Sequence, residues 1–517
     1  MKLFTTTVAA ALLATSALTL PTPVQAQELT MAVAAQSAGQ LDPHVSTRTE
    51  DKVIFAMIFN GLVRFAPGSM SSDAIEPDLA DSWEVSEDGL VWTFTLRKGV
   101  QFHGGYGELT AADVVYSLSR AADPDRSSVA SDYKAFKAVE ALDDYTVRIT
   151  LSEGIPSLLG VVANYHGGNI VSARAAEELG ESFATNPVGT GPFAFDDLAE
   201  GQFVRLTAHQ GYFRGAPKLD TITIRYMAAS SARDLAFQTG ELHIIEGERE
   251  DRWVANTTAS GNAKVDVFEP GELRTLHVNT MAKPFDDIRV RQALAHAINR
   301  DELVAFAGNL VARGNEAPVP DGYIGHEPDI DFLPYDQDRA RALLAEAGYP
   351  NGVTVPIAIT ERSSLFGPMQ VIQAQLSQVG INLEFDVMEH SAWHAAIRDD
   401  VSPLVLYGAA RFPVADTYLT QFYHSDSIVK TPTAVTNFSH CSLADQQIVA
   451  ARSEPNPEKQ QELWSEAQQL LVTEVCSIPL FELLQVWARA PEVDLGYELE
   501  GALSLGPIIT EKTTLSN

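Results

Sequence analysis

The chain has 517 residues, two cysteines and a formal net charge of −32 at pH 7. Such an acidic surface repels nucleic acid and anionic lipid, so the composition argues against proteins that bind those polyanions. The charge serves solubility, or alternatively it steers cationic solutes toward the protein. The length is sufficient for two or three domains.

The first 26 residues have the pattern of a secretory signal peptide. Lys2 supplies the positive start, residues 8–20 form a short apolar run, and residues 24–26 form a small-residue cleavage site before Gln27. The run is too short to span a bilayer, and no later segment is apolar for long enough. Because no cysteine follows the cleavage site to carry a lipid anchor, we expect a secreted periplasmic protein without such an anchor.

Residues 79–120 are expected to form a strand, a loop and a helix. Apolar and polar side chains alternate over residues 92–97, which is the period-two pattern of a half-buried strand. Thr110 followed by Asp113 predicts the capped start of a helix. These features are those of scaffold, so we do not expect the binding site in this block.

Strands and helices alternate along the rest of the chain. Period-two alternation predicts further strands at residues 147–151, 221–226, 353–359 and 381–387. Asp336 is the predicted cap of a helix that ends at Gly348, and an apolar stripe over residues 369–379 predicts a helix that ends at Gly380. This order of strand, helix and strand predicts a parallel or mixed sheet that is covered by helices.

Several motifs follow the order and spacing of one known family. The block at 79–120 closely resembles the signature of the family 5 extracellular solute-binding proteins, the peptide- and nickel-binding receptors of ABC importers. Further matches cover nearly the whole chain after the signal: LDPH at 41–44, PVGTGPF at 187–193, GEL at 240–242, VNT at 278–280, PFDD at 284–287, RVRQAL at 289–294 and AGYP at 347–350.

The resemblance implies an α/β fold, namely a two-lobed periplasmic-binding-protein clamshell of type II-like architecture with mixed sheets covered by helices. The chain is expected to cross between the lobes twice, near residues 274–279 and 478–486. The expected boundaries are residues 27–275 with 480–517 for lobe I, about 64–206 for an extra subdomain inserted in lobe I, and 276–479 for lobe II.

The resemblance also implies a ligand site around residues 406–419. In the peptide receptors an aspartate of this stretch forms a salt bridge with the α-amine of the ligand, and Asp416 occupies its position. Val414, Ala415 and Ala409 replace other residues of the usual motif, which opens the alternative of a non-peptide solute. A further alternative makes Asp416 the N-cap of the following helix.

Two arginines are candidate partners for a carboxylate, because the planar guanidinium binds both oxygens. Arg362 follows the predicted strand 353–359, where some dipeptide receptors place such an arginine, and Arg411 lies in the stretch that the resemblance assigns to the site. Surface or inter-lobe ion pairs are the alternative for both. The other candidates, for which packing in the core or hinge is the alternative, are Tyr407, Phe412, Trp393, Trp487, His277, Gln36 and Ser37.

The cysteines and motifs bear on redox state and catalysis. Cys441 and Cys476 either pair in an oxidising compartment or stay free. Related receptors carry a disulfide near the position of Cys441, but its usual short-range partner is absent here. The sequence contains no GxSxG, HExxH or P-loop pattern and no Cys/His cluster, so we expect no catalytic residues, metal or cofactor.

The expected function is that of a periplasmic substrate-binding protein of an ABC importer. As a monomer, it would capture a dipeptide or short oligopeptide between its lobes and deliver it to the membrane permease. The alternative keeps this role for a non-peptide solute, such as an opine or amino-acid conjugate, an oligosaccharide, a nickel chelate or haem. A secreted hydrolase or chaperone-like protein is a third reading, which no motif requires.

Overall fold

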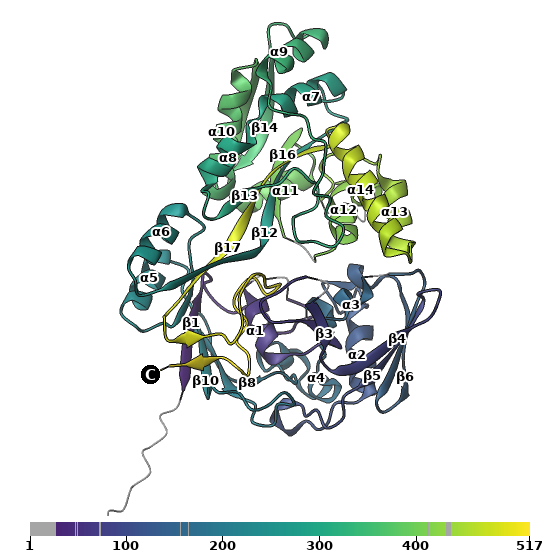
Figure 1. The fold of residues 1–517 in the computed structure, drawn as a ribbon, viewed down its shortest axis with the longest axis vertical. Helices are drawn as coiled ribbons and strands as arrows, with labels where there is room; N and C mark the ends of the chain where they lie inside the picture. The colour runs from purple at the N-terminus through teal and green to yellow at the C-terminus, as the bar shows by residue number, and fades with distance from the viewer. Residues whose placement is uncertain are drawn as a thin grey trace, which may run out of the picture.

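The computed structural model describes residues 27–516, apart from positions 47, 49, 72–73, 156, 164, 411–412 and 431–435. The predicted signal peptide and two candidate site residues, Arg411 and Phe412, lie outside the described residues. The chain forms two lobes joined by a pair of long strands, which confirms the predicted two-lobed α/β architecture (Figure 1).

The first half of the chain builds the lower lobe in Figure 1 and the elements beside the crossing strands. Its elements are β1 (Glu28–Val33), α1 (Asp51–Ile58), β2 (Val63–Phe65), β3 (Ile75–Pro77), β4 (Ala80–Val85), β5 (Val91–Leu96), η2 (His103–Gly105), α2 (Ala111–Ala121), η3 (Ala130–Tyr133), β6 (Phe136–Asp143), β7 (Thr146–Leu151), α3 (Leu158–Val161), η4 (His166–Gly168), α4 (Ala173–Leu179), η5 (Gly180–Thr185), β8 (Phe193–Ala199), β9 (Phe203–Ala208), β10 (Thr221–Tyr226), α5 (Ser230–Gln238), β11 (Ile244–Glu246) and α6 (Asp251–Ala259).

The second half builds the upper lobe and returns to the lower one at its end. Its elements are β12 (Lys264–Val278), α7 (Ile288–Ala297), α8 (Arg300–Ala307), β13 (Ala312–Gly314), α9 (Gln337–Glu346), β14 (Val353–Thr360), α10 (Ser363–Ser377), β15 (Ile381–Met388), α11 (His390–Arg398), β16 (Leu404–Ala409), α12 (Ala415–Tyr423), η6 (Ser425–Ser427), α13 (Asp445–Ser453), α14 (Pro457–Thr473), β17 (Ser477–Arg489), β18 (Val493–Asp494) and β19 (Thr514–Leu515).

One mixed sheet runs through both lobes. Nine strands of the described chain form it, in the order β16-β12-β17-β11-β1-β10-β9-β8, with β13 attached to β17. The strands β12 and β17 pair antiparallel over most of their length and connect the lobes. The predicted lobe boundaries near residues 275 and 479 fall inside these two strands, and the limits of the inserted subdomain stay a prediction.

Local sequence patterns explain the elements of the lower lobe. β10 alternates buried and half-buried residues, as its period-two sequence predicts. Thr110 and Asp113 form the predicted capping box at the start of α2. In the LDPH motif, the carboxylate of Asp42 forms an ion pair with Arg120 of α2 and the ring of His44 hydrogen-bonds the backbone oxygen of Asn169. The LDPH motif therefore ties the start of the chain to α2.

The upper lobe contains the predicted strand, helix and strand unit. β14 and β15 are parallel neighbours, and α10 connects them, which confirms the strands expected at 353–359 and 381–387. Asp336 caps α9 as predicted, because its side chain accepts a hydrogen bond from the amide of Arg339. A disulfide joins Cys441 to Cys476, directly before β17. No helix of the described chain has the length and hydropathy that membrane crossing demands.

Candidate functional site

Three arginines gather around one glutamate beside the crossing strands. Glu272 and Arg274 follow a bulge in β12, Arg249 comes from the loop between β11 and α6, and Arg362 lies at the start of α10. Nη1 of Arg249 is 2.9 Å from Oε1 of Glu272, and Nη2 of Arg274 is 3.0 Å from Oε2. We call these four residues the arginine cluster.

The charges of the arginine cluster shift the pKa values of its members. Burial alone would raise the pKa of Glu272, but the charges of Arg249, Arg274 and Arg362 outweigh it and lower that pKa to about 2. Burial lowers the pKa of the Arg274 guanidinium, and Glu272 opposes this shift. Glu272 is therefore ionised, and the cluster contains more positive than negative charge.

The guanidinium groups of Arg274 and Arg362 still have hydrogen-bond donors that could bind a further anion. The side chain of Arg274 is 6% exposed, and its Nε has no hydrogen-bond partner among the described residues. Arg362 is exposed, and no ion pair joins it to a carboxylate in the described part of the chain. Its Nη1 donates to Nε2 of His390 at 3.3 Å. A carboxylate is the ligand group that these donors fit best.

A glycine on the neighbouring strand makes room for Arg274. Gly408 of β16 is paired with Arg274 of β12. A Cβ added to Gly408 would lie 1.5 Å from Nη1 of Arg274, so any larger residue would displace the guanidinium. The stretch that the sequence assigned to the ligand, residues 406–419, thus reaches the arginine cluster through Gly408.

Aromatic rings lie next to Arg362. Trp393 of α11 is fully buried, and its Nε1 donates to the backbone oxygen of Ala358 at 3.3 Å. Its ring stacks on His390 and on the half-buried Tyr407, with centroids 5.8 and 6.4 Å apart. The structure thus brings the candidates Arg362, Tyr407 and Trp393 together, with Tyr407 and His390 as the more accessible rings.

Asp416 already has a partner within the protein. α12 begins at Ala415 with Val414 as its N-cap, so the interpretation of Asp416 as the N-cap was wrong. Nε of Arg452 in α13 donates to the two carboxylate oxygens of Asp416 at 3.0 and 3.2 Å, and Nη2 of Arg452 donates to Thr420. Burial raises the pKa of Asp416, and Arg452 opposes this shift.

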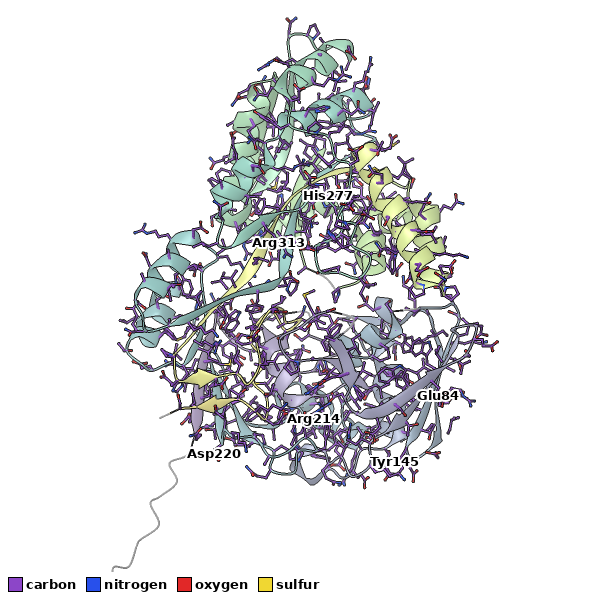
Figure 2. The ribbon with its side chains drawn as sticks, viewed as in Figure 1. Glu84, Tyr145, Arg214, Asp220, His277 and Arg313 are labelled. Carbon is purple, nitrogen blue, oxygen red and sulfur yellow. A yellow bond between two sulfur atoms is a disulfide. The ribbon has the colours of Figure 1, made fainter. Side chains whose placement is uncertain are left out.

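The remaining candidates occupy different environments. His277 is buried against the rings of Phe422, Tyr423 and Phe438, and burial lowers its pKa to about 3, which indicates packing in the upper lobe (Figure 2). Trp487 of β17 is also buried, and its Nε1 donates to the backbone oxygen of Leu505.

Gln36 and Ser37 lie in the loop after β1, exposed and half-buried respectively. Arg411 and Phe412 are outside the described residues. The predicted roles of these four residues therefore stay predictions.

Sequence reasoning missed Arg249, Glu272, Arg274 and Gly408. Glu272 and Arg274 are opposite charges two residues apart in β12, and this spacing places both side chains on one face of a strand, which the sequence alone could have indicated. Arg249 and Gly408 gave no such signal, because their roles depend on contacts with residues far away in the sequence.

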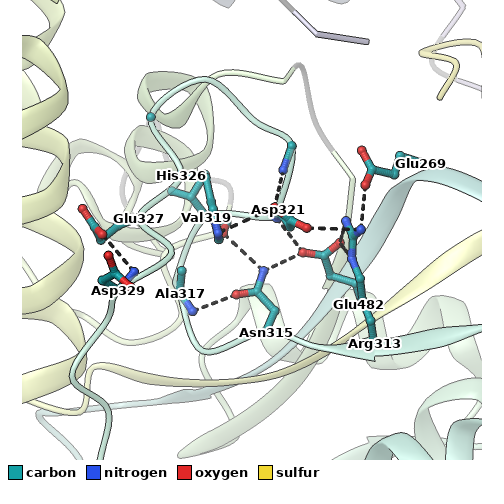
Figure 3. Close-up of polar contacts among 12 residues, drawn as sticks. Glu269, Arg313, Asn315, Ala317, Val319, Asp321, His326, Glu327, Asp329 and Glu482 are labelled. Carbon is teal, nitrogen blue, oxygen red and sulfur yellow. Dashed lines mark hydrogen bonds and ion pairs between the residues drawn. The ribbon is translucent and has the colours of Figure 1, made fainter. Parts of the chain in front are cut away.

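A second charged cluster lies beside the crossing strands (Figure 3). Arg313 of β13 contacts Glu269, Asp321 and Glu482, and we call these four residues the acidic cluster. The side chain of Glu482 is fully buried and also accepts hydrogen bonds from Nδ2 of Asn315 and the amide of Asp321. Because Glu482 is paired with Leu273, it lies on the face opposite to Glu272 and Arg274.

Comparison with known proteins identifies the family. The model of the bacterial extracellular solute-binding proteins, family 5 Middle, matches residues 74–429. The chain belongs to the family 5 bacterial extracellular solute-binding proteins. Members of this family are non-enzymatic receptors of ABC transporters, which agrees with the resemblance of the motifs.

Individual family 5 relatives bind different solutes. The glutathione-binding protein GsiB of Salmonella choleraesuis is 30% identical over 454 residues, which are 85% of this chain and 86% of the relative. The structure of MoaA from A. tumefaciens R10 in complex with mannopinic acid is 49% identical, with a TM-score of 0.84 over 95% of this chain and 100% of that one.

A third family 5 relative was solved with a peptide. DppA from Helicobacter pylori, in complex with the peptide STSA, is 29% identical, with a TM-score of 0.78 over 95% of this chain and 98% of that one. The family therefore fixes the receptor role and leaves the solute to be argued from the site.

Proposed function

We propose that this protein is the ABC-importer receptor for a small anionic solute of the opine or amino-acid-conjugate kind. The observation that carries the proposal is the arginine cluster, in which two guanidinium groups contact a single carboxylate and the charge of a third acts on it. Guanidinium groups bind carboxylates with two parallel hydrogen bonds, so a carboxylate-bearing solute fits this surface. The cluster offers a local positive site in a chain whose net charge is −32.

The state of Asp416 supports a non-peptide solute. A peptide needs an acid for its α-amine, and the carboxylate of Asp416 is held by Arg452 instead. An amine that displaced Arg452 would leave a guanidinium without its partner, which is costly in a partly buried place. The identity of 49% with a protein solved in complex with mannopinic acid supports the same choice.

Peptides of acidic character are the second candidate. Relatives named as glutathione-binding proteins match 85% of the chain at 30% identity, and the arginine cluster would also accept the carboxylates of such a peptide. The dipeptide or oligopeptide first expected from the sequence therefore remains a competing solute class.

The proposed action follows from the two-lobed fold. After export through its signal peptide, the monomeric receptor binds the solute between the lobes in the periplasm. The solute stabilises the closed form through contacts that are better made when the lobes are together. The closed form then docks on the permease of the importer, without chemical change to the solute.

Binding to purified residues 27–517 tests the proposal. We expect mannopinic acid to raise the melting temperature and glutathione and the dipeptide Ala-Phe to leave it unchanged. A ligand at about 100 times its dissociation constant adds about 2.7 kcal/mol to the free energy of unfolding, which a thermal shift detects easily. Calorimetric titration then gives the affinity.

Two substitutions connect the binding to the arginine cluster. Arg274→Met should abolish the shift, whereas the matched change Arg341→Met, on the exposed surface of α9, should leave it intact. A shift with glutathione or Ala-Phe and none with mannopinic acid would overturn the proposed solute class in favour of the peptide alternative.

A further inference from the structure

Two of the three guanidinium groups in the arginine cluster are already bridged by a carboxylate of the protein. One carboxylate oxygen of Glu272 forms an ion pair with Nη1 of Arg249, and the other oxygen forms one with Nη2 of Arg274. The carboxylate of Glu272 therefore lies between two guanidinium groups. A solute carboxylate would bind best at the same place.

Building on the proposed function, we propose that Glu272 sets the charge that the solute must carry. It competes internally for Arg249 and Arg274, so the receptor binds solutes with two carboxylates in preference to solutes with one.

The charges within the cluster support this selectivity. One glutamate neutralises one of three guanidinium charges, and Arg274 is buried. A buried charge without compensation is unfavourable, so the closed receptor is most stable when the solute brings two negative charges. A solute with a single carboxylate leaves one guanidinium charge uncompensated.

Two histidines and one glutamate are titratable neighbours of the arginine cluster. His390 and His394 stay neutral near pH 7, because burial lowers the pKa of both rings. Burial raises the pKa of the Glu246 carboxyl near Arg249, and the charge of Arg249 and a hydrogen bond from the amide of Ala34 oppose this shift. Glu246 is the same in every variant compared below, so it does not cause differences between them. The selectivity therefore rests on the four residues of the arginine cluster.

The proposal predicts a gain of affinity when Glu272 is neutralised. Glu272→Gln keeps the size of the side chain and frees two guanidinium groups for solute anions. We expect this variant to bind mannopinic acid and the simple dicarboxylate glutarate about tenfold more tightly than the wild type, since charges a few ångströms apart interact strongly in a partly buried site. We also expect its preference for glutarate over the monocarboxylate butyrate to grow, because three guanidinium charges then face the solute without compensation by Glu272.

Calorimetric titration with these three probes, supported by thermal shifts at millimolar glutarate and butyrate, provides the test. Glu241→Gln is the matched control, because Glu241 is exposed, pairs with Arg225 and changes the net charge equally. The double variant Glu272→Gln/Arg249→Gln restores the charge of the cluster and should bring the affinity back toward the wild-type value. Circular dichroism and urea unfolding verify that each variant is folded.

The outcomes separate this inference from the proposed function. If a folded Glu272→Gln variant bound the dicarboxylates no more tightly than the wild type, or kept the same preference over butyrate, the role of Glu272 would be refuted. If the wild type did not bind mannopinic acid, the proposed solute would be wrong, while the comparison of glutarate with butyrate would still decide the role of Glu272.

Discussion

At the scale of single residues, Asp416 shows how a position can be recognised while its partner is not. The motif predicted this aspartate to lie in the ligand-binding stretch, and the structure places it in the first turn of α12. Its partner Arg452 lies 36 residues further on and comes from another helix. Local sequence patterns carry no information about such a pairing, so the ion pair of Asp416 could not be predicted from the sequence.

The ion pair of Asp416 and Arg452 should contribute to stability. We expect Asp416→Ala to lower the free energy of unfolding by about 1–3 kcal/mol, because the guanidinium of Arg452 loses a charge-assisted partner. A double-mutant cycle with Arg452→Met, followed by urea unfolding, measures the coupling. The exposed pair of Arg341 and Asp338 serves as the control and should show a coupling below about 0.5 kcal/mol. A coupling near zero, together with lost affinity for Ala-Phe, would restore the amine-binding role first expected for Asp416.

At the scale of elements, the positions of many strands and helices could be predicted from the sequence. The order and register in which the strands pair could not. The strands at 221–226, 353–359 and 381–387 were expected from their sequences; β10 buries alternate residues throughout, whereas β14 and β15 do so only in their first halves. By contrast, β12 pairs with β16 across more than a hundred residues, and this register sets Gly408 beside Arg274. The arginine cluster is a product of that register, which is why the sequence pointed to Arg362 and missed Arg274.

The contact between β16 and β12 predicts the effect of a single methyl group. Gly408→Ala should weaken binding of mannopinic acid at least about tenfold, because the new Cβ displaces the guanidinium of Arg274 from Glu272. The fold should persist with a loss of about 1–3 kcal/mol, the usual effect of overpacking. Titration calorimetry and urea unfolding measure the two effects. Gly314→Ala in β13 is the control, since its Cβ would meet only Val304 at 3.9 Å; equal losses of affinity in both variants would disprove the special role of Gly408.

At the scale of the whole molecule, the acidic cluster fixes the geometry where the chain passes between lobes. Arg313 links β13 of the upper lobe to Glu482 of β17 and to Glu269 of the bulge in β12. The backbone of Glu269 in turn hydrogen-bonds Glu500 and Ala502, which belong to the C-terminal segment. Motions of the lobes must therefore bend the strands around an anchored point.

Removal of the buried carboxylate at this point should be costly. We expect Glu482→Leu to lower the free energy of unfolding by about 3–5 kcal/mol, because Arg313 and Asn315 lose their buried acceptor. Urea unfolding measures this loss, and small-angle scattering shows whether the distribution between open and closed forms changes. Glu178→Leu, in the exposed pair with Arg174 of α4, is the control and should cost less than about 1 kcal/mol. Similar losses in the two variants would show that the acidic cluster has no special structural role.

The place of β17 in the sheet has a consequence for the order in which the protein forms. This strand is the last long one in the chain, yet it lies between β12 and β11 in the middle of the nine-stranded sheet. A nascent chain that ends before residue 477 thus contains most of both lobes but lacks one of the two strands that join them. Neither lobe can complete its part of the sheet until synthesis is almost finished, so the chain remains without its final fold for nearly the whole time that it is being made.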